Sequence, residues 1–387
     1  MKYSLVLDVG TTGVKAFLFD HHLQQIGKAY ETYPLHKPKR GWVEQDPKAI
    51  LTASIRVLRS VTHASKLPMT AIERMGITNQ RETIVFWDAK TGTPIYPAIV
   101  WQDERTKARC QALAKHHQGD VRKKTGLHLD AYFSASKAEW LMENVPKAKK
   151  LLDQDQLRFG TIDTWLMWHL CTNHPHVTDE TNAARTLLFN IQTKEWDTDL
   201  CTIFHVPMDI LPDVKPSISN FGTLLPSIVG RPIPIQAVCG DQQSSFFAAA
   251  SSTKVSPVTK ITYGTGVFLG QSLGSTFKLS ENFFTTLVPH GHESAYALEA
   301  KICVSGPDVT KRLKNPKALR TYFYELAKKV DTEIKKLPKK PKQLLIDGGS
   351  SRDGLILAIQ EEVSGISTQP LISYDGTALG IAMMLLK

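Results

Sequence analysis

Three apolar segments of this chain each run directly into a glycine-rich turn. They cover residues 5–9, 260–263 and 344–347, and the turns that follow are Gly10-Thr11-Thr12-Gly13, Gly264-Thr265-Gly266 and Gly348-Gly349-Ser350. Apolar residues resume after the first two turns, which predicts a hairpin of two strands at each place. Glycines let backbone N–H groups approach the oxygens of a phosphate, and threonine hydroxyls add further donors. The sequence therefore predicts turns that can hold phosphates.

Each turn taken alone is an ordinary hairpin turn, so the prediction depends on their occurring together. Two of the three apolar segments also place an aspartate near the turn, Asp8 and Asp347. A Walker phosphate loop would need a glycine-rich turn that opens a helix and ends in Gly-Lys-Ser or Gly-Lys-Thr, and the sequence has no such motif.

The length of the chain predicts more than one domain. A chain of 387 residues is too long for a single ordinary core, and 42% hydrophobic and 22% charged residues are typical of a globular protein. Residues 197–235 are rich in proline and apolar residues and are interpreted as a passage between domains. We therefore expect an N-terminal domain over residues 1–235 and a C-terminal domain over residues 236–387.

Local patterns predict further strands and helices. Strands are expected over residues 74–78 and 83–87, and helices over residues 136–143, 244–249, 317–336 and from 377 onward. In the third of these helices the apolar residues recur every three or four positions, which leaves a basic face for the solvent.

The charge and the cysteine content of the chain indicate which binding partners and which cellular compartment to expect. The chain carries a net charge of +10, but its basic clusters lack the interleaved aromatic residues of nucleic-acid-binding motifs, so no nucleic acid is expected. No apolar run approaches the roughly 20 residues of a membrane span, and the N-terminus has no signal pattern. Five scattered cysteines are typical of free thiols. We expect a cytoplasmic protein that binds no membrane and no metal through cysteine.

Two segments of the sequence resemble a known family. Residues 76–83 read Gly-Ile-Thr-Asn-Gln-Arg-Glu-Thr and residues 98–106 read Ala-Ile-Val-Trp-Gln-Asp-Glu-Arg-Thr. With the glycine turns, they resemble the FGGY carbohydrate kinases and, among these, the glycerol kinases, over most of residues 1–305 and again from about 344. The resemblance implies an α/β fold of two actin-like, ribonuclease H-like ATPase lobes, the second shortened, with the active site in the cleft between them. It implies ATP- and Mg²⁺-dependent phosphorylation of glycerol to glycerol 3-phosphate.

The resemblance also implies a set of residues for a small polyol. Such a substrate needs hydrogen-bonding groups of both kinds and apolar walls. Asp241 is the implied general base, accepting the proton of the attacking hydroxyl as the γ-phosphoryl group moves in line; an N-cap of a helix is its structural alternative. The implied contacts of glycerol or a similar polyol are Arg81, Glu82, Trp101, Tyr132, Asp241, Gln242 and Phe268.

On the nucleotide side the resemblance implies the three turns and one metal ligand. Asp8 would orient Mg²⁺ through water, and its alternative is a plain strand-end aspartate. The implied nucleotide contacts are Gly10, Thr11, Thr12, Gly13, Lys15, Gly264, Thr265, Gly266, Gly349, Ser350 and Asp353.

Three departures from the family pattern keep other functions open. Lys15 stands where these kinases usually carry arginine, Asp353 stands where an asparagine usually meets the adenine, and only about forty residues separate Gly306 from Asp347. One alternative is a homologue that binds a polyol or a protein partner without turnover. A second is a metal-dependent nuclease that uses Asp8, Asp241 and Asp347. The sequence leaves open the choice between glycerol, dihydroxyacetone and glyceraldehyde, and also the oligomeric state, a homo-oligomer included.

Overall fold

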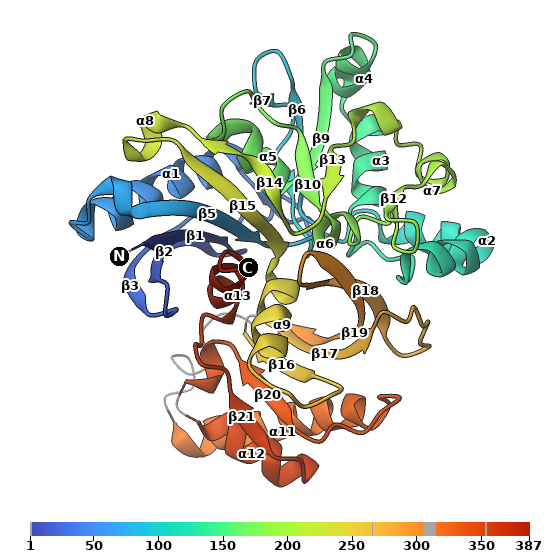
Figure 1. Ribbon diagram of the computed structural model, residues 1–387. Helices are drawn as coiled ribbons and strands as arrows, with labels where there is room; N and C mark the ends of the chain where they lie inside the picture. The colour runs from blue at the N-terminus through green and yellow to red at the C-terminus, as the bar shows by residue number, and fades with distance from the viewer. Residues whose placement is uncertain (1, 265, 305–314, 353) are drawn as a thin grey trace. The chain divides into compact units, whose positions relative to one another are not determined.

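The computed structural model describes residues 2–264, 266–304, 315–352 and 354–387. Thr265 and Asp353, both predicted to contact nucleotide, lie outside this range. The described chain forms two compact units (Figure 1). The first runs to Asp241 and also includes Gly291–Ser294 and Ile381–Lys387, and the second contains Gln242–His290 and Ala295–Gly380.

The first unit is built on a six-stranded sheet in the order β14-β15-β5-β1-β2-β3. Strands β1 and β2 form the predicted antiparallel hairpin, in which Asp8 lies opposite Lys15. Strand β5 runs parallel to β1, and β15 runs parallel to β5, so the C-terminal ends of these three strands share one edge. The strands are β1 (Tyr3–Val9), β2 (Gly13–Asp20), β3 (Gln25–Thr32), β5 (Ile72–Asn79), β14 (Ile218–Leu224) and β15 (Ile233–Gly240).

Helices cover this sheet because its strands are almost wholly apolar. All but one residue of β1 is buried, a pattern expected where both faces of a strand are covered. Helix α1 (Pro47–Ala64) packs on β2 and β3, and helix α5 (Ile162–Leu170) contacts β5 and β14. Asp46 caps α1 by accepting a hydrogen bond from the backbone N–H of Lys48.

The rest of the first unit consists of a second sheet, two short strand pairs and further helices. Strand β6 is central to the second sheet and pairs with β7, β8 and β9. The strands are β4 (Glu44–Gln45), β6 (Ile84–Asp88), β7 (Thr93–Pro94), β8 (Ala98–Ile99), β9 (Leu157–Thr161), β10 (Val177–Asp179), β11 (Phe189–Asn190), β12 (Glu195–Trp196) and β13 (Asp213–Lys215). The helices are α2 (Lys107–Thr125), α3 (Ala135–Asn144), α4 (Pro146–Leu152), α6 (Glu180–Ala183), α7 (Thr198–Ile203) and α8 (Pro226–Val229).

The second unit contains a six-stranded sheet in the order β18-β19-β17-β16-β20-β21. Its strands are β16 (Thr259–Tyr263), β17 (Gly266–Gly274), β18 (Phe284–His290), β19 (Glu293–Val304), β20 (Leu344–Asp347) and β21 (Thr368–Pro370). Its helices are α9 (Asp241–Ser251), whose first residue belongs to the first unit, α11 (Pro316–Ile334), α12 (Leu355–Ser364) and α13 (Gly376–Met384), whose end groups with the first unit. Apolar residues of α11 and α12 form one core with β16, β17 and β20.

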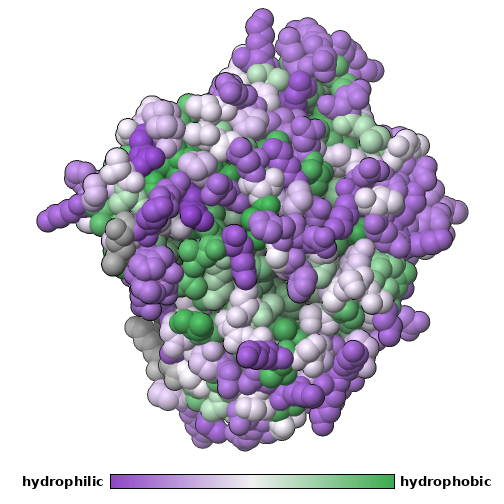
Figure 2. Space-filling model, viewed as in Figure 1, coloured by the Kyte–Doolittle hydropathy of each residue, from purple (hydrophilic) through white to green (hydrophobic). Residues whose placement is uncertain are grey.

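The two sheets repeat one topology. The series β3-β2-β1-β5-β15 of the first unit matches the series β19-β17-β16-β20-β21 of the second, with antiparallel pairing in the first half and parallel pairing in the second. The first two glycine turns therefore occupy equivalent positions, between β1 and β2 and between β16 and β17. Hydrophilic residues cover much of the face shown in Figure 2.

Most predicted elements are confirmed, and one interpretation is wrong. The predicted strands correspond to β5 and β6, and the predicted helices to α3, α9, α11 and α13. Residues 197–235 are not a passage between domains, because they form α7, β13, β14, α8 and the start of β15 within the first unit. Ile235 lies inside β15, and the two compact units divide after Asp241. None of the described helices combines the length and apolar character that a membrane span needs.

Candidate active site

Parallel pairing of β5 with β15 brings two predicted site residues together in the first unit. Asn79 at the end of β5 lies opposite Gly240 at the end of β15, so the residues that follow both strands leave the same edge of the sheet. As a result, the Nε of Arg81 lies 3.3 Å from Oδ1 of Asp241. The Arg81 side chain is 1% exposed and that of Asp241 is 29% exposed, so the aspartate is the member that solvent or a ligand can reach.

Glu82 stands beside Arg81 in an unusual backbone conformation. Its φ angle is 62°, in the left-handed region that few non-glycine residues adopt. Its Oε1 accepts a hydrogen bond of 2.7 Å from Nε of Arg185 and lies 3.7 Å from Nε of Arg81. Arg185 is fully buried and Glu82 is 2% exposed. This is a buried, ion-paired group and not the surface ion pair that Arg81 and Glu82 would ordinarily form.

Trp101 and Tyr132 make an aromatic corner in the same unit. Their ring centroids are 5.8 Å apart with planes at 81°, an edge-to-face arrangement. The indole Nε1 of Trp101 donates to Oγ1 of Thr11 at 2.8 Å, and the amide of Gln45 donates to the carbonyl oxygen of Thr11 at 2.6 Å. Thr11 thus joins the first glycine turn to the aromatic corner.

A lysine lies beneath the aromatic corner. Nζ of Lys137 donates to the carbonyl oxygens of Tyr132 and Phe133 at 2.9 and 3.0 Å. Burial lowers the pKa of Lys137 from 10.5 to about 8, because a charged ammonium group loses hydration there. The guanidinium of Arg185 also lies 5.6 Å from the ring centroid of Tyr132. Two cations therefore fix the position of this tyrosine.

The first glycine turn places Asp8 and Lys15 at its base. Nζ of Lys15 lies 3.5 Å from Oδ2 of Asp8, as their cross-strand register requires. The backbone N–H of Gly10 donates to the carbonyl oxygen of Gly13 at 3.0 Å and closes the turn. Gly13 is required by packing, because a Cβ there would lie 2.6 Å from the carbonyl oxygen of Glu31. Thr12 is exposed.

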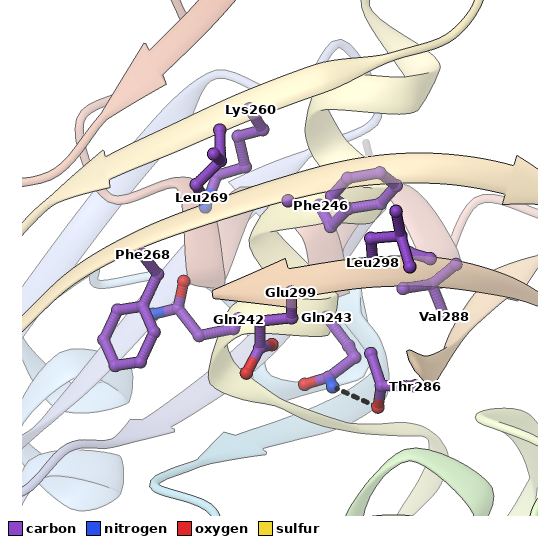
Figure 3. A pocket seen from close by; sticks show the side chains of 12 residues that line it. Gln242, Gln243, Phe246, Lys260, Phe268, Leu269, Thr286, Val288, Leu298 and Glu299 are labelled. Carbon is purple, nitrogen blue, oxygen red and sulfur yellow. Dashed lines mark hydrogen bonds between the residues drawn. The ribbon is translucent and has the colours of Figure 1, made fainter. Parts of the chain in front are cut away.

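In the second unit Gln242 and Phe268 line one small pocket (Figure 3). Its volume is about 20 Å³. Oε1 of Gln242 accepts a hydrogen bond of 3.1 Å from Oγ1 of Thr262, and Phe268 lies opposite Thr262 in the pairing of β16 with β17. The neighbouring Gln243 donates to Thr286 at 3.3 Å across the same pocket.

The two glycine turns of the second unit are shaped by close contacts. The N–H of Gly264 donates to the carbonyl oxygen of Gly266 at 3.1 Å, and a Cβ on Gly266 would lie 2.6 Å from the ring of Phe268. Gly348 has a φ of 98° and approaches the backbone of Tyr263, so only glycine fits there. Gly349 and Ser350 follow in a short 3₁₀ turn (Gly349–Ser351), and a Cβ on Gly349 would meet nothing.

Sequence reasoning missed three residues that the structure adds to the first unit's cluster: Arg185, Gln45 and Lys137. Arg185 lies more than 100 residues from Glu82 in the chain, and its only signal was a single charge within a run of small and polar residues, 181–186. Among the described residues, the one group with metal-ligand spacing is Glu139, Glu143 and His205. Glu139 in that group is held by Arg109 at 2.6 and 2.9 Å, and neither Asp8, Asp241 nor Asp347 belongs to it.

Comparison with known proteins decides the family. Residues 3–248 match the model of the FGGY family of carbohydrate kinases, N-terminal domain. The chain belongs to the FGGY family of carbohydrate kinases. A glycerol kinase of Dichelobacter nodosus is 42% identical over 308 residues, which cover 79% of this chain and 62% of that protein. A glycerol kinase of Mycoplasma genitalium is 40% identical over 352 residues, which cover 87% of this chain and 69% of that protein.

The fold of this FGGY kinase also matches that of a solved relative. The crystal structure of Plasmodium falciparum glycerol kinase with ADP superposes with a TM-score of 0.90 at 29% identity, covering 99% of this chain and 89% of that one. The predicted fold class, α/β with two actin-like ATPase lobes, is confirmed. As a member of a kinase family the chain is expected to use ATP, while its match spans 62% of the length of the D. nodosus protein.

Proposed function

We propose that this FGGY kinase transfers the γ-phosphoryl group of ATP to glycerol and forms glycerol 3-phosphate. The observation that carries the proposal is the buried Arg81–Glu82–Arg185 group beside the accessible carboxylate of Asp241. It offers donors and acceptors next to a base at one edge of one sheet, and relatives about 40% identical are named glycerol kinases.

In this proposal the first unit binds the polyol. Arg81 donates to a hydroxyl oxygen, and Glu82, held by Arg185, accepts from a hydroxyl group. Trp101 and Tyr132 supply apolar walls for the carbon chain and exclude water, which would otherwise hydrolyse ATP. Gln242 and Phe268 of the second unit are proposed as further contacts.

Asp241 is the proposed general base. It accepts the proton of the attacking primary hydroxyl while the γ-phosphoryl group moves in line. It is the first residue of α9 and directly follows the last residue of β15, which fixes its backbone at the end of that strand. The 3.3 Å contact with Arg81 keeps the carboxylate of Asp241 beside the proposed polyol contacts Arg81 and Glu82.

Asp8 fits a magnesium ion that is held mainly by phosphate and water. A single strand-end carboxylate is a hard oxygen ligand, and Mg²⁺ in kinases takes few ligands from protein. When bound, the ion offsets the charge that develops on the phosphate oxygens. Lys15, 3.5 Å from Asp8, supplies a point charge for phosphate in place of the two-pronged contact of an arginine. Gly10, Thr11, Thr12 and Gly13, with Gly264, Gly266, Gly349 and Ser350 of the second unit, are the proposed phosphate and nucleotide contacts.

We propose further that the units act as two functional domains, with polyol and phosphate groups in the first and nucleotide groups in the second. A cytoplasmic location is proposed because the five cysteines are free, and four of them are buried, as suits a reducing compartment. A homologue that binds polyol without turnover is the second candidate, favoured by Lys15 in place of the usual arginine and by the stretch of about forty residues that separates Gly306 from Asp347.

Product identification tests the proposal. Purified protein with Mg²⁺-ATP is given glycerol, dihydroxyacetone or glyceraldehyde in turn, and phosphorylated products are followed by ³¹P nuclear magnetic resonance. The proposal predicts glycerol 3-phosphate from the wild type and from Asp197→Asn, and none from Asp241→Asn. Asp197 caps α7 and pairs with Lys124, and it is not one of the proposed site residues. Glycerol binding measured by calorimetry without any product would favour the second candidate. Equal product from Asp241→Asn would contradict the assignment of the base.

A further inference from the structure

A buried ion pair in the second unit joins Asp347, which precedes the third glycine turn, to a lysine that is not among the proposed site residues. Nζ of Lys260 is 3.1 Å from Oδ1 of Asp347, and both side chains are 3% exposed. Lys260 belongs to β16, and Asp347 is the last residue of β20, which runs parallel to it. The net stability that such a pair supplies is small, because the desolvation of two charges offsets their attraction. The role of this ion pair is therefore better inferred from the groups that it contacts than from its contribution to stability.

One branch of hydrogen bonds leads from Lys260 to Gln242. Lys260 donates to Oγ1 of Thr262, and Thr262 donates to Oε1 of Gln242 at 3.1 Å. Because Thr262 has one hydroxyl proton, the lysine determines where that proton points. The amide of Gln242 is thereby turned with its oxygen toward Thr262. Lys260 and Gln242 line the same pocket (Figure 3).

A second branch leads from Lys260 to the third glycine turn. Asp347 also accepts a hydrogen bond from Ser245 of α9, and its carboxylate lies against Gly376, where α13 begins. The next residue is Gly348, whose φ of 98° starts the turn that continues through Gly349 and Ser350. The carboxylate of Asp347 thus sets the point from which this turn leaves the sheet.

We propose that Lys260 is a positioning residue that holds Gln242 and the turn 348–350 in one fixed arrangement. The inference rests on the proposed function, in which Gln242 contacts the polyol and the turn contacts the nucleotide. In this proposal Lys260 itself contacts neither substrate. It acts through two branches that meet at one ammonium group, a hydrogen bond to Thr262 and an ion pair with Asp347, and groups joined in this way restrict one another's movement.

Removal of the ammonium group should disturb both branches at once. Lys260→Met keeps an unbranched side chain of similar length. It leaves the carboxylate of Asp347 buried without its cation and frees the hydroxyl of Thr262 to rotate. Small displacements of positioning groups cost up to about 100-fold in rate. We expect the KM for glycerol and the KM for ATP each to rise at least about tenfold.

Single-branch variants separate positioning from a general loss of stability. Thr262→Val should raise the KM for glycerol and leave the KM for ATP within about twofold of the wild type. Ser245→Ala should do the reverse. Gln271→Leu is the matched control: Gln271 is 1% exposed on β17 of the same sheet and donates to Thr259 and to the carbonyl oxygen of Lys339. It should lower the unfolding midpoint and change neither KM.

The outcomes distinguish this inference from the proposed function. A wild type that turns over glycerol, with both KM values of Lys260→Met within about twofold, overturns the inference alone. If Lys260→Met does not fold, equal effects of Thr262→Val and Ser245→Ala on both substrates overturn it. If the wild type binds ligands without turnover, the same comparison is made with dissociation constants for glycerol and ADP from calorimetry. A wild type that binds neither ligand overturns the proposed function and this inference together.

Discussion

Replacing Arg185 with methionine removes the closest cation from the carboxylate of Glu82. The guanidinium of Arg185 is fully buried and lies 2.7 Å from a carboxylate that is itself 2% exposed. Removing one partner of a buried ion pair costs about 3–5 kcal/mol, because the other charge is left without compensation. Arg81 remains 3.7 Å from Glu82 and compensates part of this charge. We therefore expect Arg185→Met to lower the free energy of unfolding by about 3 kcal/mol.

Tryptophan fluorescence measures this loss of stability in the first compact unit, which contains Arg185 and Glu82. All seven tryptophans lie in the first unit, at positions 42, 87, 101, 140, 165, 168 and 196, so their emission during urea or thermal unfolding reports on that unit. A loss of about 3 kcal/mol corresponds to a fall of roughly 6–12 °C in the midpoint for a unit of this size.

A double variant supplies the control. Arg185→Met with Glu82→Gln removes both charges and should recover most of the lost stability, because a neutral pair of similar volume needs no compensating charge. It should still bind glycerol weakly, since the acceptor of the proposed polyol site has become an amide. A cost below about 1 kcal/mol for Arg185→Met, or a double variant no more stable than the single one, would refute the reasoning.

Three further predictions concern Lys137, Gly13 and Arg81. The pKa of Lys137 is about 8 in the folded state and 10.5 in the unfolded state, so between these pH values the unfolded state binds more protons. As the pH rises from 8 to 10.5, the wild type should therefore gain up to about 3 kcal/mol of stability relative to Lys137→Met in urea unfolding, and a difference that does not change with pH would contradict the burial of this charge. Gly13→Ala should cost about 1–3 kcal/mol because the new Cβ meets the backbone of β3, whereas Gly119→Ala in α2, where nothing lies within 4 Å, should cost nothing. Arg81→Ala should raise the KM for glycerol far more than it lowers kcat in steady-state assays, and an unchanged KM would argue against Arg81 as a polyol contact.

The elements that sequence predicted well are those with a local cause. The hairpin of β1 and β2 follows from two apolar runs around Gly10–Gly13, and α11 follows from its apolar periodicity. The passage expected over residues 197–235 was wrong because prolines at Pro207 and Pro226 begin short helical turns as readily as they mark a linker.

The parts of the site that sequence could not supply depend on long-range pairing. Arg81 meets Asp241 only because β15 joins β5 in one particular register, 160 residues apart in the chain. The left-handed backbone of Glu82 and its contact with Arg185 have no local signature, since glutamate rarely adopts a positive φ. Lys260 was visible only as one residue of a strand, because the burial of its charge depends on the neighbouring strand β20.

The release of ADP by purified protein with Mg²⁺-ATP, measured with and without glycerol, shows whether this chain phosphorylates glycerol with Asp241 as the base. We expect release that depends on glycerol in the wild type and in Asp197→Asn, and that is lost in Asp241→Asn while calorimetry still detects glycerol binding. ADP release at the same rate with and without glycerol, or release that persists in Asp241→Asn, would contradict the proposed reaction and its base.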